Sequence, residues 1–198
     1  MIKLCIFDMG GVVVRNYQVW PLILDFLDRK EEDVSSPGFD KAHHDYGLGL
    51  INEDDLWAQY VKASGRDIPP HEGSLMGKFF TPTLDQPTVA IIQKLKALGI
   101  SVVCGTNTGD AHYTVHVRLG QYDIFDRVYA SHLMHLAKPD PAFFTCILEA
   151  EGVKPEETFF TDDWADNIEA AVKMGIAGFL YTGADTLKGH LNSLGLPV

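Results

Sequence analysis

The chain has 198 residues, and 46% of them are hydrophobic, which is enough for one packed core with an inserted second lobe. Its formal net charge of -11 at pH 7, without a Lys/Arg cluster, argues against a nucleic acid partner. No run of about twenty apolar residues is present, so the sequence predicts no membrane span and no membrane partner.

The first predicted element is a strand over residues 2–7, apolar except for Lys3 and therefore expected to be buried on both faces of a parallel sheet. Asp8 follows this strand directly, before Gly10 and Gly11. Ligands of such sheets bind beyond the carboxyl ends of the strands. The carboxylate of Asp8 is therefore a candidate catalytic group.

The segment 15–82 shows helical periodicity without a convincing strand. We expect helices over residues 17–27, 39–46 and 53–63. The sequence thus predicts a helical insert over residues 15–82 and a core domain made of residues 1–14 and 83–198.

From residue 83 onward, helical and apolar stretches alternate. We expect helices over 87–98, 110–119, 139–151, 166–174 and 187–194, and strands over 100–104, 128–130, 158–161 and 177–181. Alternation of this kind predicts an α/β fold with a doubly wound parallel sheet.

Polar side chains follow three of the later strands. Thr106 and Asn107 follow the strand 100–104, Lys138 follows the strand 128–130 by a loop, and Asp162 with Asp163 follows the strand 158–161. The carboxyl ends of parallel strands share one edge of the sheet, so these groups are expected to converge on Asp8.

These motifs, in this order, resemble those of the haloacid dehalogenase-like hydrolase superfamily, whose core is Rossmann-like and often carries a helical cap. The matching segments are residues 7–12 (FDMGGV), 106–108 (TNT), 138–139 (KP) and 162–167 (DDWADN). More narrowly, the chain resembles the bacterial branch that contains sugar-phosphate phosphatases of the glucose-1-phosphatase type.

The resemblance implies a role for each motif. Asp8 would attack phosphorus and form an aspartyl-phosphate, Thr106 and Asn107 would bind the phosphoryl oxygens, and Lys138 would neutralise charge. The implied cofactor is Mg²⁺. Its implied ligands are the Asp8 carboxylate, the Gly10 carbonyl and Asp163, and Asp162 of the same acidic motif is a fourth metal-site residue. The substrate would be a small phosphorylated metabolite, with a sugar phosphate favoured.

One position departs from the common pattern of this superfamily. Most of its phosphatases have a second Asp two residues after the nucleophile, where this chain has Gly10. The backbone carbonyl remains for a metal, but the proton-transfer group is absent, which favours substrates with good leaving groups, such as glycosyl phosphates. Asp162, a histidine of the cap or a water could take its place. Trp164 is also unusual and could narrow the pocket.

Other side chains are weaker candidates. Arg15 could face the phosphate or anchor the hinge of the cap, and His43 is a candidate substrate contact in the cap. The histidine pairs 112/116 and 132/135 are assigned to wet surface rather than to zinc.

The cysteines at 5, 104 and 146 are interpreted as buried thiols in a reducing compartment. Because the start at Met1 has no signal peptide pattern, we expect a cytoplasmic protein.

Two other functions stay open from the sequence. A metal-independent 2-haloacid dehalogenase would also use an Asp on the first strand, although the pair Asp162 and Asp163 argues against it. A degenerate phosphatase that only binds phosphorylated ligands or partners is suggested by Gly10. We expect a monomer or a homodimer.

Overall fold

The computed structural model describes residues 1–198, with the exception of the side chain of Asp33. It contains a five-stranded parallel sheet in the order β5-β4-β1-β6-β7. The strands are β1 (Leu4–Phe7), β4 (Ser101–Thr106), β5 (Arg127–Ala130), β6 (Thr158–Asp162) and β7 (Ala177–Leu180). This arrangement confirms the predicted α/β fold with a doubly wound parallel sheet.

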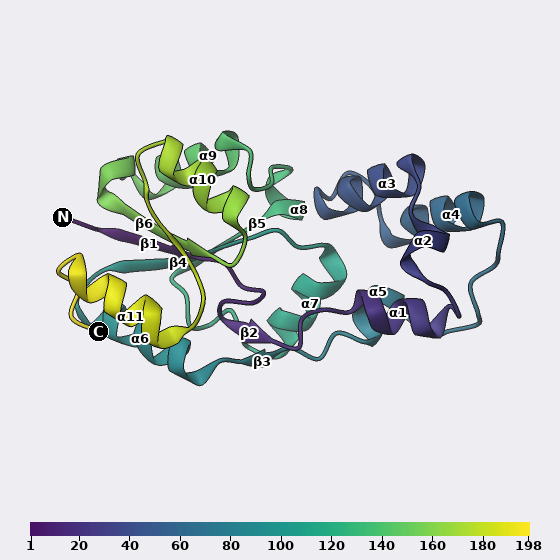
Figure 1. Cartoon of the computed structure of the whole chain (residues 1–198), viewed down its shortest axis with the longest axis horizontal. Helices are drawn as coiled ribbons and strands as arrows, with labels where there is room; N and C mark the ends of the chain where they lie inside the picture. The colour runs from purple at the N-terminus through teal and green to yellow at the C-terminus, as the bar shows by residue number, and fades with distance from the viewer.

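Helices cover both faces of the sheet (Figure 1). One face carries α6 (Gln86–Ala97) and α11 (Ala184–Ser193), and the other carries α9 (Pro141–Glu151) and α10 (Ala165–Lys173). The remaining elements of the core are α7 (Asp110–Arg118), α8 (Ser131–Met134) and a 3-10 turn (Pro155–Glu157). Helix α9 begins two residues later than predicted, because the side chain of Asp140 caps it by accepting from the backbone N of Ala142 at 2.8 Å.

The central strand β1 is buried on both faces, as its apolar sequence predicts. Cys5 and Phe7 pack with α6 and α11, whereas Leu4 and Ile6 pack with α9 and α10. Since successive side chains of a strand point to opposite faces, this uniform apolar run requires helices on both sides. Asp8 therefore emerges from the middle of the sheet, between the ends of β4 and β6.

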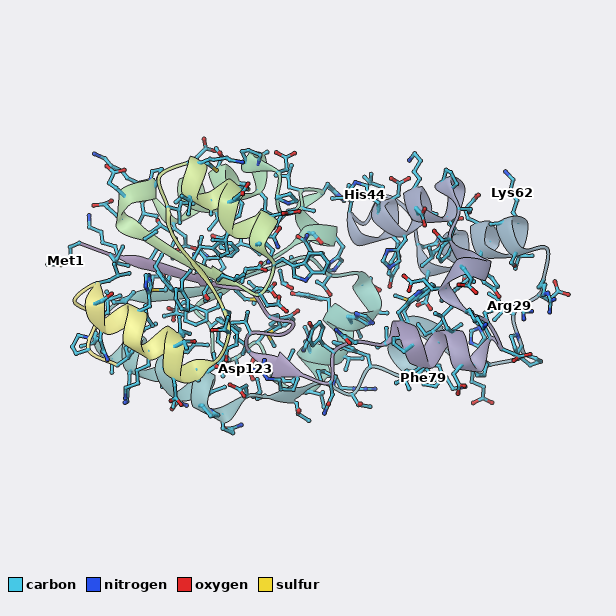
Figure 2. All side chains as sticks on the ribbon, viewed as in Figure 1. Met1, Arg29, His44, Lys62, Phe79 and Asp123 are labelled. Atoms are coloured by element: carbon cyan, nitrogen blue, oxygen red, sulfur yellow. The ribbon has the colours of Figure 1, made fainter. Side chains whose placement is uncertain are left out.

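The insert forms a second, helical lobe beside the core (Figure 1), which we call the cap. It contains α1 (Trp20–Phe26), α2 (Glu31–Val34), α3 (Pro37–Gly47), α4 (Glu53–Ser64) and α5 (Leu75–Lys78) around an apolar cluster that also includes Ala111 and Val115 of α7. In Figure 2, Met1 and Lys62 lie at opposite ends of the molecule, and His44 lies where the two lobes meet. Helices α2 and α5 have four residues each, too few to show a helical period in the sequence.

Two short strands join the cap to the core. β2 (Val14–Arg15) pairs antiparallel with β3 (Thr83–Leu84), and the backbone N of Asp85 donates to the carbonyl of Val13 at 2.9 Å. The two connections therefore lie side by side, and the cap is attached at one place. Neither strand was predicted, because a two-residue strand leaves no alternation to detect.

Two glycines offer a matched test of this packing. A methyl group at Gly105 of β4 would lie 2.8 Å from Cγ2 of Ile6, whereas one at Gly189 of α11 would meet nothing within 4 Å. Gly105→Ala should lower the free energy of unfolding by about 1–3 kcal/mol through overpacking. Gly189→Ala should raise it by about 0.5–1 kcal/mol through helix propensity. Urea unfolding measures both, and equal effects at the two positions would contradict the packing described here.

Candidate active site

Asp8 lies at the carboxyl end of β1, where its backbone N donates to the carbonyl of Thr161 at 3.0 Å. The residue is buried, with 8% of its surface exposed. Burial raises the pKa of the Asp8 carboxyl above its ordinary value, Lys138 opposes this rise, and Asp162 adds to it. The carboxylate thus depends on a neighbouring cation to remain ionised.

That cation is the ammonium group of Lys138. Its Nζ donates to Oδ1 of Asp8 at 2.7 Å and to Oδ2 of Asp162 at 2.6 Å. Burial by itself lowers the pKa of Lys138, but the two carboxylates more than offset this effect and raise it. An ammonium held between two carboxylates stays charged and bridges the side chains that follow β1 and end β6.

Asn107 positions the backbone of Lys138. Its Nδ2 donates to the carbonyl of Lys138 at 2.8 Å, and its Oδ1 accepts from the backbone N of Lys138 at 2.9 Å. One N–H of the Asn107 amide remains for a ligand. The Asn107 side chain therefore holds the loop that carries Lys138 in place, and the sequence did not predict this contact. Thr106, the last residue of β4, is buried nearby and lines the same cavity.

The acidic motif supplies two carboxylates in different situations. Oδ1 of Asp162 accepts from the backbone N of Trp164 at 2.8 Å, and Oδ2 accepts from Nδ2 of Asn167 at 3.0 Å in addition to Lys138. Asp163 is half-buried and accepts from the phenol of Tyr17 at 3.2 Å. Burial, and then the charge of Asp162, raise the pKa of Asp163. Both oxygens of Asp162 accept hydrogen bonds from other residues of the protein. Asp163 lines the cavity and has fewer hydrogen-bond partners.

These groups surround a cavity of about 460 Å³. Asp8, Asp162 and Asp163 each offer a carboxylate oxygen within 4.8 Å of the others. Gly10, the fourth predicted metal-site residue, also lines the cavity. Three carboxylates beside one ammonium leave an excess of negative charge, and oxygen donors suit a hard divalent cation. The residues therefore fit Mg²⁺.

The glycine turn lets the acidic motif approach β1. A methyl group at Gly11 would lie 2.1 Å from Oδ2 of Asp163, and the φ of +76° favours glycine. A methyl group at Gly10 would lie 3.0 Å from Cδ2 of Tyr17. The ring of Tyr17 thus occupies the space next to position 10, into which a longer side chain would extend.

Tyr17 is the site residue that sequence reasoning missed. It lines the catalytic cavity and contacts Asp163, although it comes from the connection to the cap. Burial and the Asp163 carboxylate raise the pKa of its phenol, which therefore stays protonated at neutral pH. No pattern in the sequence pointed to it, because its contact with Asp163 joins residues 146 positions apart. Trp164, with 65% of its surface exposed, also lines the cavity and stands at its mouth.

Two predicted substrate contacts lie outside the catalytic cavity. The guanidinium of Arg15 donates to the carbonyl of Gly11 and to the phenol oxygen of Tyr181 at 3.0 Å, and it lies 3.5 Å from Asp85. These partners favour the hinge-anchor alternative for Arg15. His43 lies on α3, where its ring packs against Trp20 at 6.1 Å between centroids. It lines a cavity of the cap instead.

The assignment of the histidine pairs to wet surface was wrong for three of the four side chains. His116 is buried and its Nδ1 lies 2.6 Å from Oε1 of Gln121, and His112 stacks on Phe80 with 3.9 Å between ring centroids. His132 is buried as well, whereas His135 is exposed. Among the described residues, the carboxylate cluster is the one group arranged to hold a metal.

Comparison with known proteins agrees with this geometry. The family model of haloacid dehalogenase-like hydrolases matches residues 2–175. A sesquiterpene phosphatase of Aspergillus oryzae is 29% identical over 184 residues, covering 91% of this chain and 90% of its own. A D-ribitol-5-phosphate phosphatase of Bacteroides thetaiotaomicron is 26% identical over 194 residues, covering 90% and 91%.

The fold is shared with solved structures of this family. An enzyme from Bacteroides thetaiotaomicron, solved as a complex with magnesium and inorganic phosphate, aligns with a TM-score of 0.72. The alignment covers 90% of this chain and 93% of that one, with 24% sequence identity. This likeness supports the arrangement of core and helical insert.

Removing the lysine tests the charge balance of the site. Lys138→Met should lower the free energy of unfolding at pH 8 by about 3 kcal/mol, because two buried carboxylates lose their counterion. The loss should shrink toward pH 5, because burial raises the pKa of Asp8, and its carboxyl takes up a proton more readily once Lys138 is removed. Lys173→Met removes an exposed pair with Glu169 and should cost less than about 1 kcal/mol. Thermal or urea unfolding of both variants measures these changes. Equal losses of unfolding free energy at pH 8 would contradict a buried ion triad of Lys138, Asp8 and Asp162.

Proposed function

Because the chain belongs to the family of haloacid dehalogenase-like hydrolases, we propose that it is a Mg²⁺-dependent phosphatase acting on a small phosphorylated metabolite through a phosphorylated Asp8. The observation that carries the proposal is the Lys138 ammonium between Asp8 and Asp162, with Asp163 at the same cavity. A nucleophile, a fixed cation and a set of oxygen donors for a metal are the parts that phosphoryl transfer requires.

The proposed reaction has two steps. An oxygen of Asp8 attacks phosphorus, the bond from phosphorus to the ester oxygen breaks, and the alcohol leaves with a proton. Water then attacks phosphorus and breaks its bond to Asp8, which releases phosphate and restores the carboxylate. Thr106 and the free N–H of Asn107 hold the phosphoryl oxygens, and Lys138 keeps Asp8 ionised and neutralises charge. Mg²⁺, held by Asp8, Asp163 and the Gly10 carbonyl, would neutralise the charge of the transferring group.

The protonation of the leaving alcohol sets this site apart. Position 10 has no carboxylate, and both oxygens of Asp162 already accept hydrogen bonds. His43 does not line the catalytic cavity; it lines a cavity of the cap and a second one at the junction of cap and core. These contacts argue against Asp162 and His43 as the group that protonates the leaving alcohol. A bound water is the candidate that remains. They support a preference for esters whose alcohol leaves readily.

The finer resemblance to glucose-1-phosphatase-type enzymes predicts a glycosyl phosphate, and that stays a prediction. The relatives act, by their names, on a sesquiterpene phosphate and on D-ribitol 5-phosphate, so the family relationship supports a phosphate monoester without selecting the alcohol.

A cytoplasmic location and a monomeric or dimeric state also remain predictions. Among the described residues, no helix combines the length and apolar character that a bilayer span requires.

Phosphate release tests the proposal. The full chain with Mg²⁺ should release phosphate from acetyl phosphate, p-nitrophenyl phosphate or glucose 1-phosphate, and chelation of the metal should abolish the release. Asp8→Asn should lower kcat by at least roughly 10³-fold, because the nucleophile is lost. Asp140→Asn, which alters an exposed helix cap, is the matched control and should leave kcat unchanged.

Each alternative has its own signature in the same assay. Metal-independent halide release from 2-chloropropionate would favour the dehalogenase. Phosphate bound by the chain without release from any ester would favour the binding protein. Release that persists in Asp8→Asn would refute the covalent mechanism.

A further inference from the structure

The cap contains a cavity of about 480 Å³ that is separate from the catalytic one. Its apolar lining includes Val19, Trp20, Val34, Phe39 and Met76. The indole of Trp20 stacks on the ring of Phe39, with 5.7 Å between centroids and 23° between planes. Val19, Val34, Phe39 and Met76 are each at most 5% exposed, so the cavity is set into the apolar cluster of the cap rather than lying on a polar surface.

This cavity adjoins the catalytic cavity at Tyr17. Tyr17 lines both cavities, so one phenol ring separates the carboxylate cluster from the apolar lining. A third cavity, of about 300 Å³, runs along the same junction. It is lined by Asn107 of the core and by His43 and Met76 of the cap. The cap cavity is therefore the neighbouring space toward which a molecule with its phosphate beside Asp8 would extend, past Tyr17 or along the junction.

The charges around the cap cavity exclude a second anionic group. Among the described residues that line it, none is Lys or Arg, while Glu31 and Asp40 are exposed acids at its edge. Burial lowers the pKa of His112 to about 4 and also lowers that of His43, so both imidazoles are neutral at neutral pH. A polyol would also lose hydrogen bonds to water against the apolar lining without full replacement.

We propose that the cap cavity binds the alcohol part of the substrate and that this alcohol is apolar, so the preferred substrate is a phosphate monoester of an aliphatic or cyclic hydrocarbon alcohol. Trp20 and Phe39 are the specificity-determining residues. The inference rests on the proposed function, since it assigns the leaving group of that same reaction. It differs from the sugar phosphate predicted from the sequence, because the buried part of the lining is apolar, whereas polar side chains of the lining such as Gln18, Ser35 and Asp40 are exposed.

Binding of n-alkylphosphonates tests this assignment without any turnover. Titration calorimetry of the full chain with Mg²⁺, using chains of one to eight carbons, should show Kd falling by about fourfold for each added methylene until the cavity is filled. Inorganic phosphate should bind like methylphosphonate. Glucose 1-phosphate, titrated into Asp8→Asn to prevent hydrolysis, should bind no better than inorganic phosphate does to that variant.

Two variants of one helix locate the effect. Trp20→Ala should flatten the dependence of Kd on chain length while leaving methylphosphonate binding unchanged, which also shows that the variant is folded. Leu22→Ala, an exposed position of α1 that does not line the cavity, should keep the dependence of the wild type. The wild-type series tests the proposal by itself if Trp20→Ala does not fold.

The outcomes separate this inference from the proposed function. A Kd that does not change with chain length, or tighter binding of glucose 1-phosphate than of octylphosphonate, would overturn the apolar assignment while phosphate release could still occur. An unaltered dependence in a folded Trp20→Ala would overturn the role of this cavity. A steep chain-length dependence without phosphate release from any ester would refute the enzyme and support the apolar site.

Discussion

The site depends on one buried ammonium group. Lys138 stands between Asp8 and Asp162, which emerge from the neighbouring strands β1 and β6. Without a cation, burial would favour the protonated carboxyl at Asp8, which would then lose its nucleophilic character. The sheet fixes the two carboxylates, the Asn107 amide fixes the lysine backbone, and Asp163 adds the charge that a divalent cation would balance. The geometry is therefore set before any ligand arrives.

The two lobes divide the work of the molecule. The core presents polar groups at strand ends, where chemistry common to any phosphate ester can take place. The cap presents aromatic and aliphatic side chains, which distinguish one alcohol from another. Tyr17 lies at the border, with its ring against Gly10 and its phenol on Asp163. The absence of a carboxylate at position 10 and the presence of this ring thus belong to the same local packing.

Much of the core site could be predicted from the sequence. An uninterrupted apolar run before Asp8 indicated a central parallel strand, and the topology of such a sheet brings the end of every strand to one edge. Tyr17 and the cap cavity could not be predicted, because their contacts join residues far apart in the sequence. The four-residue helices of the cap and the two-residue strands that join it to the core were too short to show a hydrophobic period in the sequence. For Arg15 the sequence left two roles open, and only its contacts to Tyr181 and Asp85 distinguish them.

In the proposed reaction Asp8, paired with the Lys138 ammonium, carries the phosphoryl group. Acid quenching during turnover, followed by peptide mass spectrometry, measures which residue is phosphorylated. We expect a phosphorylated peptide that contains Asp8, is sensitive to hydroxylamine as an acyl phosphate is, and is absent without Mg²⁺. Phosphate release with no phosphorylated Asp8, or with the phosphoryl group on another residue, would contradict it.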